Sequence, residues 1–171
     1  MLKWLVLSDI PAQGREFSFN THADWAEMLQ KYGMECEVKE NFTLALQVLP
    51  QSDGYLLSGH LHGLLSMPCE RCLQPAELCV DRDFRVFEEI PAVSEMPSES
   101  LLREISGHFE LNIAHLMWEQ FNLYLPTKVL CSEECEGLCP VCGRNLNEKT
   151  CSCTREHVDP RMAVFKKIKI Q

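Results

Sequence analysis

The sequence predicts an α+β protein in which an antiparallel β-meander sheet is packed with two helices and followed by a C-terminal zinc-thiolate module. Three observations predict this class: long segments of alternating apolar residues, two segments with apolar residues at helical spacing, and six clustered cysteines. Residues 1–128 form the expected sheet domain, and residues 129–171 form the expected Cys-rich module with a short basic tail. A chain of 171 residues suits one domain with a metal-binding appendage.

Alternation of apolar residues with a period of two predicts three long strands. It extends over residues 36–48, 55–67 and 76–86. The connections at residues 50–54 and 68–75 are short and rich in turn-forming residues. We therefore expect the three strands to pair in sequence as antiparallel hairpins.

Two helices are predicted on either side of these strands. The first extends from Thr21 to Gly33, and its apolar stripe is formed by Trp25, Met28, Leu29 and Tyr32. The second begins at its cap Asn112 and ends at Tyr124, because a proline two residues later disfavours helical geometry in the residue before it. A polar connection with two prolines, over residues 90–100, separates the sheet from this helix.

Charge is distributed unevenly along the chain, whose net charge is -9. The first 125 residues carry 8 Lys and Arg against 19 Asp and Glu, whereas residues 149–171 carry 6 against 2. The body should therefore repel nucleic acid and suit a basic partner, and only the C-terminal segment could lie on phosphate. Within that segment Asp159 and Pro160 have the form of a helix start, so a short apolar-basic helix, ordered against a partner, is expected to follow.

The six clustered cysteines have the spacing of metal ligands. They follow the pattern C-x3-C-x3-C-x2-C-x8-C-x-C, which includes the step C-P-V-C-G. Zinc prefers thiolate ligands, and a Cys-x-x-Cys turn ending in Gly brings two sulfurs and the neighbouring backbone amides onto one ion. We predict one zinc ion per chain, with Cys139 and Cys142 as the first ligand pair, Cys151 and Cys153 as the second, and Cys131 and Cys135 in reserve.

Disulfides and an iron–sulfur cluster are the alternatives to zinc for these cysteines. Disulfides persist in secreted proteins and are rare in the reducing cytosol. The apolar run Trp4-Leu5-Val6-Leu7 is too short for the hydrophobic region of a signal peptide, and no stretch approaches the roughly 18 to 20 apolar residues of a membrane span. The sequence therefore predicts a cytoplasmic protein without a membrane partner. This location favours zinc over disulfides at the six cysteines.

A second Cys-x-x-Cys, formed by Cys69 and Cys72, falls in the loop of a predicted hairpin. It could be a redox pair, half of a shared zinc site, or a structural or recognition loop. A thioredoxin-type redox site places its first thiol at a helix N-terminus, and a hairpin loop offers no such helix. Cys36 and Cys79 fall within strand patterns and are predicted to be ordinary packed thiols.

The sequence contains no motif typical of an enzyme. G-x-S-x-G, a phosphate-binding glycine loop and H-E-x-x-H are all absent. His60 and His62 have the spacing of a metal pair on a strand, although two polar residues on a solvated face are the simpler interpretation. A zinc ion held by four thiolates has no open position for water. We therefore predict no catalytic residue, no enzymatic activity and no small-molecule substrate.

The order of these motifs resembles the YceD family, the large ribosomal RNA subunit accumulation proteins, in its zinc-cysteine-containing branch. The resemblance rests on C-E-R-C-L, a helix ending in L-Y-L-P, the stretch G-L-C-P-V-C-G-R-N-L-N from Gly137 to Asn147, and D-P-R at residues 159–161. It implies a non-enzymatic ribosome-biogenesis factor that supports accumulation of large-subunit ribosomal RNA. It also implies a ribosomal protein, ribosomal RNA or both as partners.

Two other functions remain open at this stage. A zinc-thiolate redox switch would use the same cysteines, with oxidation releasing the metal. A zinc-ribbon nucleic-acid-binding regulator would need strong, salt-dependent DNA binding, which the net charge of -9 disfavours. The residues leave open which four of the six C-terminal cysteines bind zinc, and whether Cys69 and Cys72 take part.

Overall fold

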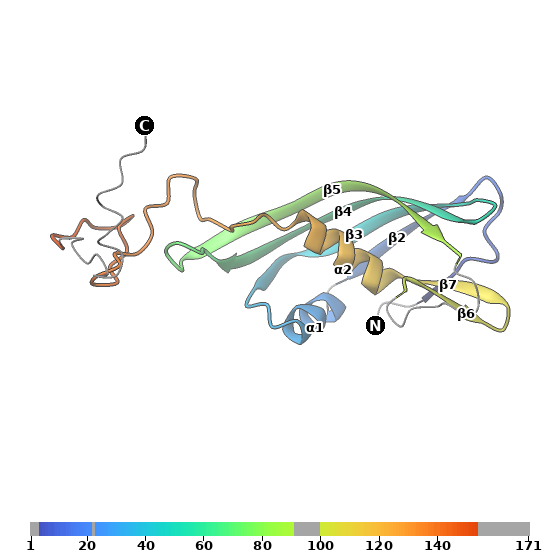
Figure 1. Ribbon diagram of the computed structural model, residues 1–171, viewed down its shortest axis with the longest axis horizontal. Coiled ribbons are helices and arrows are strands. Elements are labelled where there is room, and N and C mark those ends of the chain that lie inside the picture. The colour runs from blue at the N-terminus through green and yellow to red at the C-terminus, as the bar shows by residue number, and fades with distance from the viewer. Residues whose placement is uncertain (1–3, 22, 91–99, 154–171) are drawn as a thin grey trace, which may run out of the picture.

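A computed structural model describes residues 4–21, 23–90 and 100–153 of the chain (Figure 1). These residues form two antiparallel sheets and two helices around one main apolar core. This is the α+β class that the sequence predicts, with two sheets where one meander was expected. The predicted helix after Asp159 and most of the connection at residues 90–100 lie outside the described residues.

The larger sheet has four strands in the order β2-β3-β4-β5, so every strand pairs with its neighbour in sequence. Its strands are β2 (Arg15–Thr21), β3 (Glu37–Pro50), β4 (Gly54–Pro68) and β5 (Pro75–Glu89). The last three are the predicted long strands. β4 and β5 pair without a register shift along their whole length, so the tip of their hairpin lies beyond the helices, next to the Cys-rich segment (Figure 1).

The smaller sheet has the order β1-β7-β6, with β1 at Trp4–Val6, β6 at Leu102–Ile105 and β7 at His108–Asn112. The sequence does not reveal these strands, because three to five residues are too few to establish an alternating pattern. A local signal is present between β6 and β7. Ser106 and Gly107 both have positive φ, as a two-residue hairpin turn requires.

Both predicted helices are present and pack on the larger sheet, but the first is shorter than predicted, because Thr21, its predicted start, is the last residue of β2 and pairs with Phe42. α1 (Ala23–Lys31) contacts β3, and α2 (Ile113–Tyr124) contacts β4 and β5. The cap of α2 is Asn112, whose Oδ1 accepts a hydrogen bond from the His115 amide at 3.0 Å. Among the described residues, neither helix is long and apolar enough to cross a membrane.

The core between helices and sheet is organised by aromatic rings. Trp25 of α1 stacks on Phe42 of β3 with ring centroids 4.3 Å apart. Phe121 of α2 meets both rings edge-on, at 5.4 and 5.8 Å. Gly63 of β4 lies directly against Phe42, and a Cβ atom there would be 2.7 Å from two ring atoms. The close packing of this ring therefore depends on a glycine in β4.

Replacing Gly63 with alanine should destabilise the fold by about 1–3 kcal/mol, because the new methyl group overpacks the core against Phe42. Urea denaturation of the full chain measures the change. Ser58→Ala on the outer face of the same strand is the matched control and should change the free energy of unfolding by less than about 0.5 kcal/mol. Equal stability of the two variants would contradict the packing.

Candidate metal centres

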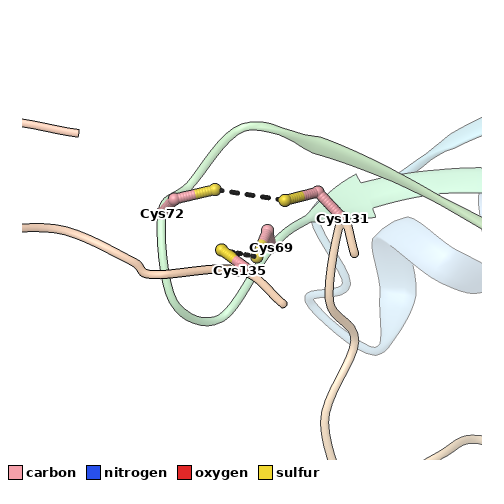
Figure 2. Close-up of side chains that lie close together, drawn as sticks. All are labelled: Cys69, Cys72, Cys131 and Cys135. Atoms are coloured by element: carbon pink, nitrogen blue, oxygen red, sulfur yellow. Dashed lines mark hydrogen bonds between the residues drawn. The ribbon is translucent and has the colours of Figure 1, made fainter. Parts of the chain in front are cut away.

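The tip of the β4–β5 hairpin and the segment after α2 together form a four-cysteine cluster, which we call the hairpin centre. Cys69 and Cys72 of the hairpin loop face Cys131 and Cys135 (Figure 2). The Sγ atoms of Cys69 and Cys135 are 3.8 Å apart, and those of Cys72 and Cys131 are 3.5 Å apart. Sulfurs bound at about 2.3 Å around a tetrahedral ion lie about 3.8 Å from one another, whereas a disulfide is about 2.05 Å long. The geometry of the hairpin centre suits a single metal ion.

A second cluster, the tail centre, consists of Cys139, Cys142, Cys151 and Cys153, whose sulfurs all lie within 4.8 Å of one another. The two centres differ in their contact with solvent. In the hairpin centre three of the four cysteines are at most 3% exposed. In the tail centre only Cys139 is buried, and Cys142 is exposed. Both centres offer four thiol ligands, but the tail centre is more accessible.

The Cys-x-x-Cys turns of the two centres share one backbone conformation. In each turn the N–H after the second cysteine donates to the carbonyl of the first cysteine at 2.9 Å. The N–H of the first cysteine donates to the carbonyl of the residue two positions after the second cysteine, at 2.8 Å in both turns. The residue that follows the second cysteine has positive φ in both turns, 62° at Leu73 and 71° at Gly143. The hairpin loop therefore has the same conformation as the Cys-x-x-Cys turn of the tail centre, with leucine in the place of glycine.

This conformation directs backbone amides at one thiol of each turn. In the tail centre the amides of Cys142 and Val141 lower the pKa of the Cys139 thiol to about 6. In the hairpin centre burial acts to raise the pKa of the Cys69 thiol, but hydrogen bonds from backbone amides outweigh it and lower the pKa to about 6. The donors are the amides of Cys131, Arg71 and Cys72. The first cysteine of each turn therefore favours the thiolate form, which a metal ion requires.

The residues between Cys69 and Cys72 hold the Cys-rich segment against the hairpin tip. The Glu70 amide donates to the Val129 carbonyl at 2.9 Å, and the Leu138 amide donates to the Arg71 carbonyl at 3.0 Å. The Arg71 guanidinium donates to the Cys135 carbonyl at 2.8 Å. The hairpin loop thus provides two thiols of the hairpin centre and a docking edge for the segment that follows α2.

The structure divides the predicted ligands between the two centres. The first and second predicted pairs, Cys139 with Cys142 and Cys151 with Cys153, come together in the tail centre. The reserve pair, Cys131 and Cys135, lies instead with Cys69 and Cys72 in the hairpin centre. A site shared in this way was one of the three alternatives for Cys69 and Cys72. Two candidate centres are present where a single ion was expected.

The two remaining cysteines lie outside both centres, one just before β3 and one in β5, and they differ in exposure. Cys36, just before β3, is half-buried and packs against the core, as predicted for a packed thiol. Cys79 is exposed, so its prediction as a packed thiol is wrong. Its position on β5 is on the polar face of the sheet, opposite Leu64.

The family of this chain follows from comparison with known proteins. The model of the family described as "Large ribosomal RNA subunit accumulation protein YceD" matches residues 57–169, a range that contains all eight cysteines of the two centres. The chain belongs to the YceD family. The resemblance noted in the sequence is thereby confirmed.

Two curated relatives of this YceD-family chain carry the name "Large ribosomal RNA subunit accumulation protein YCED homolog 1, chloroplastic". The protein from Zea mays is 25% identical over 142 residues, which cover 64% of this chain and 48% of the relative. The protein from Arabidopsis thaliana is 34% identical over 50 residues, which cover 29% of this chain and 16% of the relative. The chain thus spans less than half the length of these relatives, and no solved structure matches it.

The two centres predict the metal content of the YceD-family chain. Elemental analysis of protein purified under reducing conditions should give two ions per chain. Cys72→Ser and Cys139→Ser should each lose one ion, because each removes a ligand from a different centre. Cys79→Ser, an exposed cysteine outside both centres, is the control and should keep two. A single ion that only Cys139→Ser removes would restore the one-ion interpretation.

Metal removal should loosen the hairpin tip and the Cys-rich segment while the sheet stays folded. The apolar cluster around the hairpin centre is small, so we expect this region to depend on a bound metal for its stability. Amide hydrogen exchange after chelation should increase in residues 69–74 and 129–153. Amides of Leu57 and Leu61, which lie in the core, should stay protected. A uniform increase along β4 would show that metal and sheet form one cooperative unit.

Proposed function

We propose that this protein is a non-enzymatic ribosome-biogenesis factor that supports the accumulation of large-subunit ribosomal RNA and carries a structural zinc ion in each centre. The observation that carries this proposal is the YceD family match, which spans both centres. The names of the two curated relatives describe the same role for those proteins. The role comes to this chain through its membership of the family.

The donor sets support zinc as the cofactor. Zinc takes four thiolates in tetrahedral geometry at structural sites, and both centres offer four thiols. The sulfur separations of 3.5 and 3.8 Å in the hairpin centre match such a coordination shell. Four protein ligands fill the shell and leave no position for a substrate or a reactive water. Zinc at these positions would stabilise a surface and would not catalyse a reaction.

The charge distribution supports binding to ribosomal components. The acidic body suits a basic ribosomal protein, because complementary charge accelerates and orients association. The basic residues of 149–171 begin within the tail centre and continue directly after Cys153, so zinc there would fix the start of the segment best suited to ribosomal RNA. Zinc binding at both centres would require reduced thiols, which favours a reducing compartment, and we propose that this compartment is the cytoplasm.

A complementation experiment tests the role and its dependence on zinc. A strain lacking the protein should show a lowered ratio of large- to small-subunit ribosomal RNA, and the wild-type chain or Cys79→Ser should restore it. Cys72→Ser should fail to restore the ratio, because loss of the hairpin centre releases the segment that leads to the basic tail. Protein levels measured by immunoblotting separate lost function from lost protein.

Two outcomes would contradict different parts of this proposal. A normal ribosomal RNA ratio in the strain without the protein would exclude the role in ribosome biogenesis. Full restoration by a Cys72→Ser and Cys139→Ser double variant would leave the role intact and exclude the need for zinc. Gradient sedimentation of extracts shows whether the protein migrates with large-subunit precursors, as binding requires.

A further inference from the structure

The outer face of the larger sheet carries a group of imidazoles and carboxylates that neither the hairpin centre nor the tail centre uses. His60 and His62 of β4 point away from the core, on the same face as Asp81 and Asp83 of β5. The strand register sets His60 opposite Asp83 and His62 opposite Asp81. On the other side of β4, a register shift in β3 brings Glu40 to 3.7 Å from His62 Nε2. The register thus places five ligand-type side chains close together on one face of the sheet.

His60 lies between two carboxylates, one at each ring nitrogen. Its Nδ1 is 2.9 Å from Asp83 Oδ1, and its Nε2 is 3.1 Å from Asp81 Oδ1. A neutral imidazole carries a hydrogen on only one ring nitrogen, so it can donate to only one of these carboxylates. At the other contact, the nitrogen lone pair of a neutral ring faces a carboxylate oxygen, and either a second proton on the ring or a metal ion between the two atoms would make this contact attractive.

We propose that His60 Nε2, His62 and Asp81 bind a divalent transition-metal ion, and that Asp83 positions His60 for this role. One ligand atom from each of these three residues lies within 4.8 Å of the others. Bonds of 2.0–2.1 Å to a shared ion set neighbouring ligands about 2.9 to 3.4 Å apart, in octahedral or tetrahedral geometry. The 3.1 Å separation of His60 Nε2 and Asp81 Oδ1 is therefore that of two ligands on one ion.

Asp83 supplies the orientation that metal-binding histidines usually receive from a neighbouring carboxylate. By accepting the Nδ1 hydrogen of His60, it leaves the Nε2 lone pair directed at Asp81. The carboxylates of Asp81, Asp83 and Glu40 make the cluster negative, and Arg85 is the neighbouring cation on this face of β5. A divalent ion between Asp81 and His60 would offset this negative charge.

The donors and their exposure define the class of ion. Two imidazoles and one carboxylate prefer borderline ions such as Zn²⁺, Ni²⁺ and Cu²⁺ over Mg²⁺ and Ca²⁺. The side chains of His60, His62 and Asp81 are 45%, 41% and 61% exposed, so they can adjust their rotamers and the ion would exchange readily. His60 and Asp83 also border a hollow of about 700 Å³ on this face, which leaves room for a further ligand at the open coordination positions.

Nuclear magnetic resonance with Ni²⁺ alone as the probe tests this site in the full, zinc-loaded chain. Ni²⁺ is paramagnetic and broadens signals near the bound ion. At neutral pH the amides of residues 60–62 and 81–83 should broaden first. Substitution His60→Gln should raise the apparent Kd for Ni²⁺ by about tenfold or more. His108→Gln, which removes an exposed histidine of β7, is the control and should leave the Kd unchanged.

The role of Asp83 has its own readout. Asp83→Ala should weaken binding by about 10- to 100-fold, as is typical when a carboxylate behind a metal-binding histidine is removed. Asp83→Asn should weaken binding less, because its amide oxygen still accepts the Nδ1 hydrogen. The ¹⁵N chemical shifts of the His60 ring report which nitrogen carries the hydrogen, and only the alanine variant should change them.

Three results would overturn the proposal. Broadening centred on His108 or His115 would place Ni²⁺ elsewhere on the surface. A Kd for His60→Gln equal to that of His108→Gln would show that His60 is no ligand. Nickel–thiolate absorption together with zinc release, and no broadening at residues 60–62, would assign the binding to the four-cysteine centres. Because the Ni²⁺ titration needs no ribosomal readout, its failure leaves the proposed function untouched.

Discussion

The unbroken pairing of β4 with β5 is the constraint on which the rest of the structure depends. The two strands stay in register from Gly54 opposite Glu89 to Pro68 opposite Pro75. Side chains alternate across a strand, so this register directs Leu57 and Leu61 into the core and His60 to the outer face. A slip of one residue would exchange the two faces, and burial of the core leucines prevents that slip. The same pairing carries the hairpin tip past the core to the Cys-rich segment (Figure 1).

Beyond the core, the hairpin tip has little apolar surface with which to hold its partner segment. Its buried cluster consists of small side chains and three cysteines: Cys69, Cys72, Ala76, Val129 and Cys135. A cluster of this size contributes little hydrophobic stabilisation. Closing the loop between the hairpin tip and the segment after α2 has an entropic cost that rises slowly with loop length. Metal–thiolate bonds at the hairpin centre would be strong enough to offset that cost, and the cysteines that could form them occupy the interior of this region.

The parts of the molecule that the sequence predicts are those with short-range signals. The three long strands follow from alternation over more than ten residues, and α2 follows from its cap and from Pro126. The grouping of the tail centre is predictable because its four cysteines fall within fifteen residues of one another. The hairpin centre is only one alternative among three at the level of sequence, because 59 residues separate Cys72 from Cys131 and no local pattern encodes that contact. The short strands β1 and β6 likewise form by pairing with β7, and no local sequence pattern encodes that pairing.

The order of the two centres along the chain makes the second depend on the first. Cys135 belongs to the hairpin centre and Cys139 to the tail centre, so only three residues connect them. Within this connection Gly137 passes so close to the hairpin loop that a Cβ atom would lie 3.0 Å from the Arg71 carbonyl, and the next amide donates to that same oxygen. The hairpin loop therefore sets where the tail centre begins. The paired strands β4 and β5 therefore position the hairpin centre, and the hairpin centre positions the tail centre. The basic C-terminal segment follows the tail centre in the sequence.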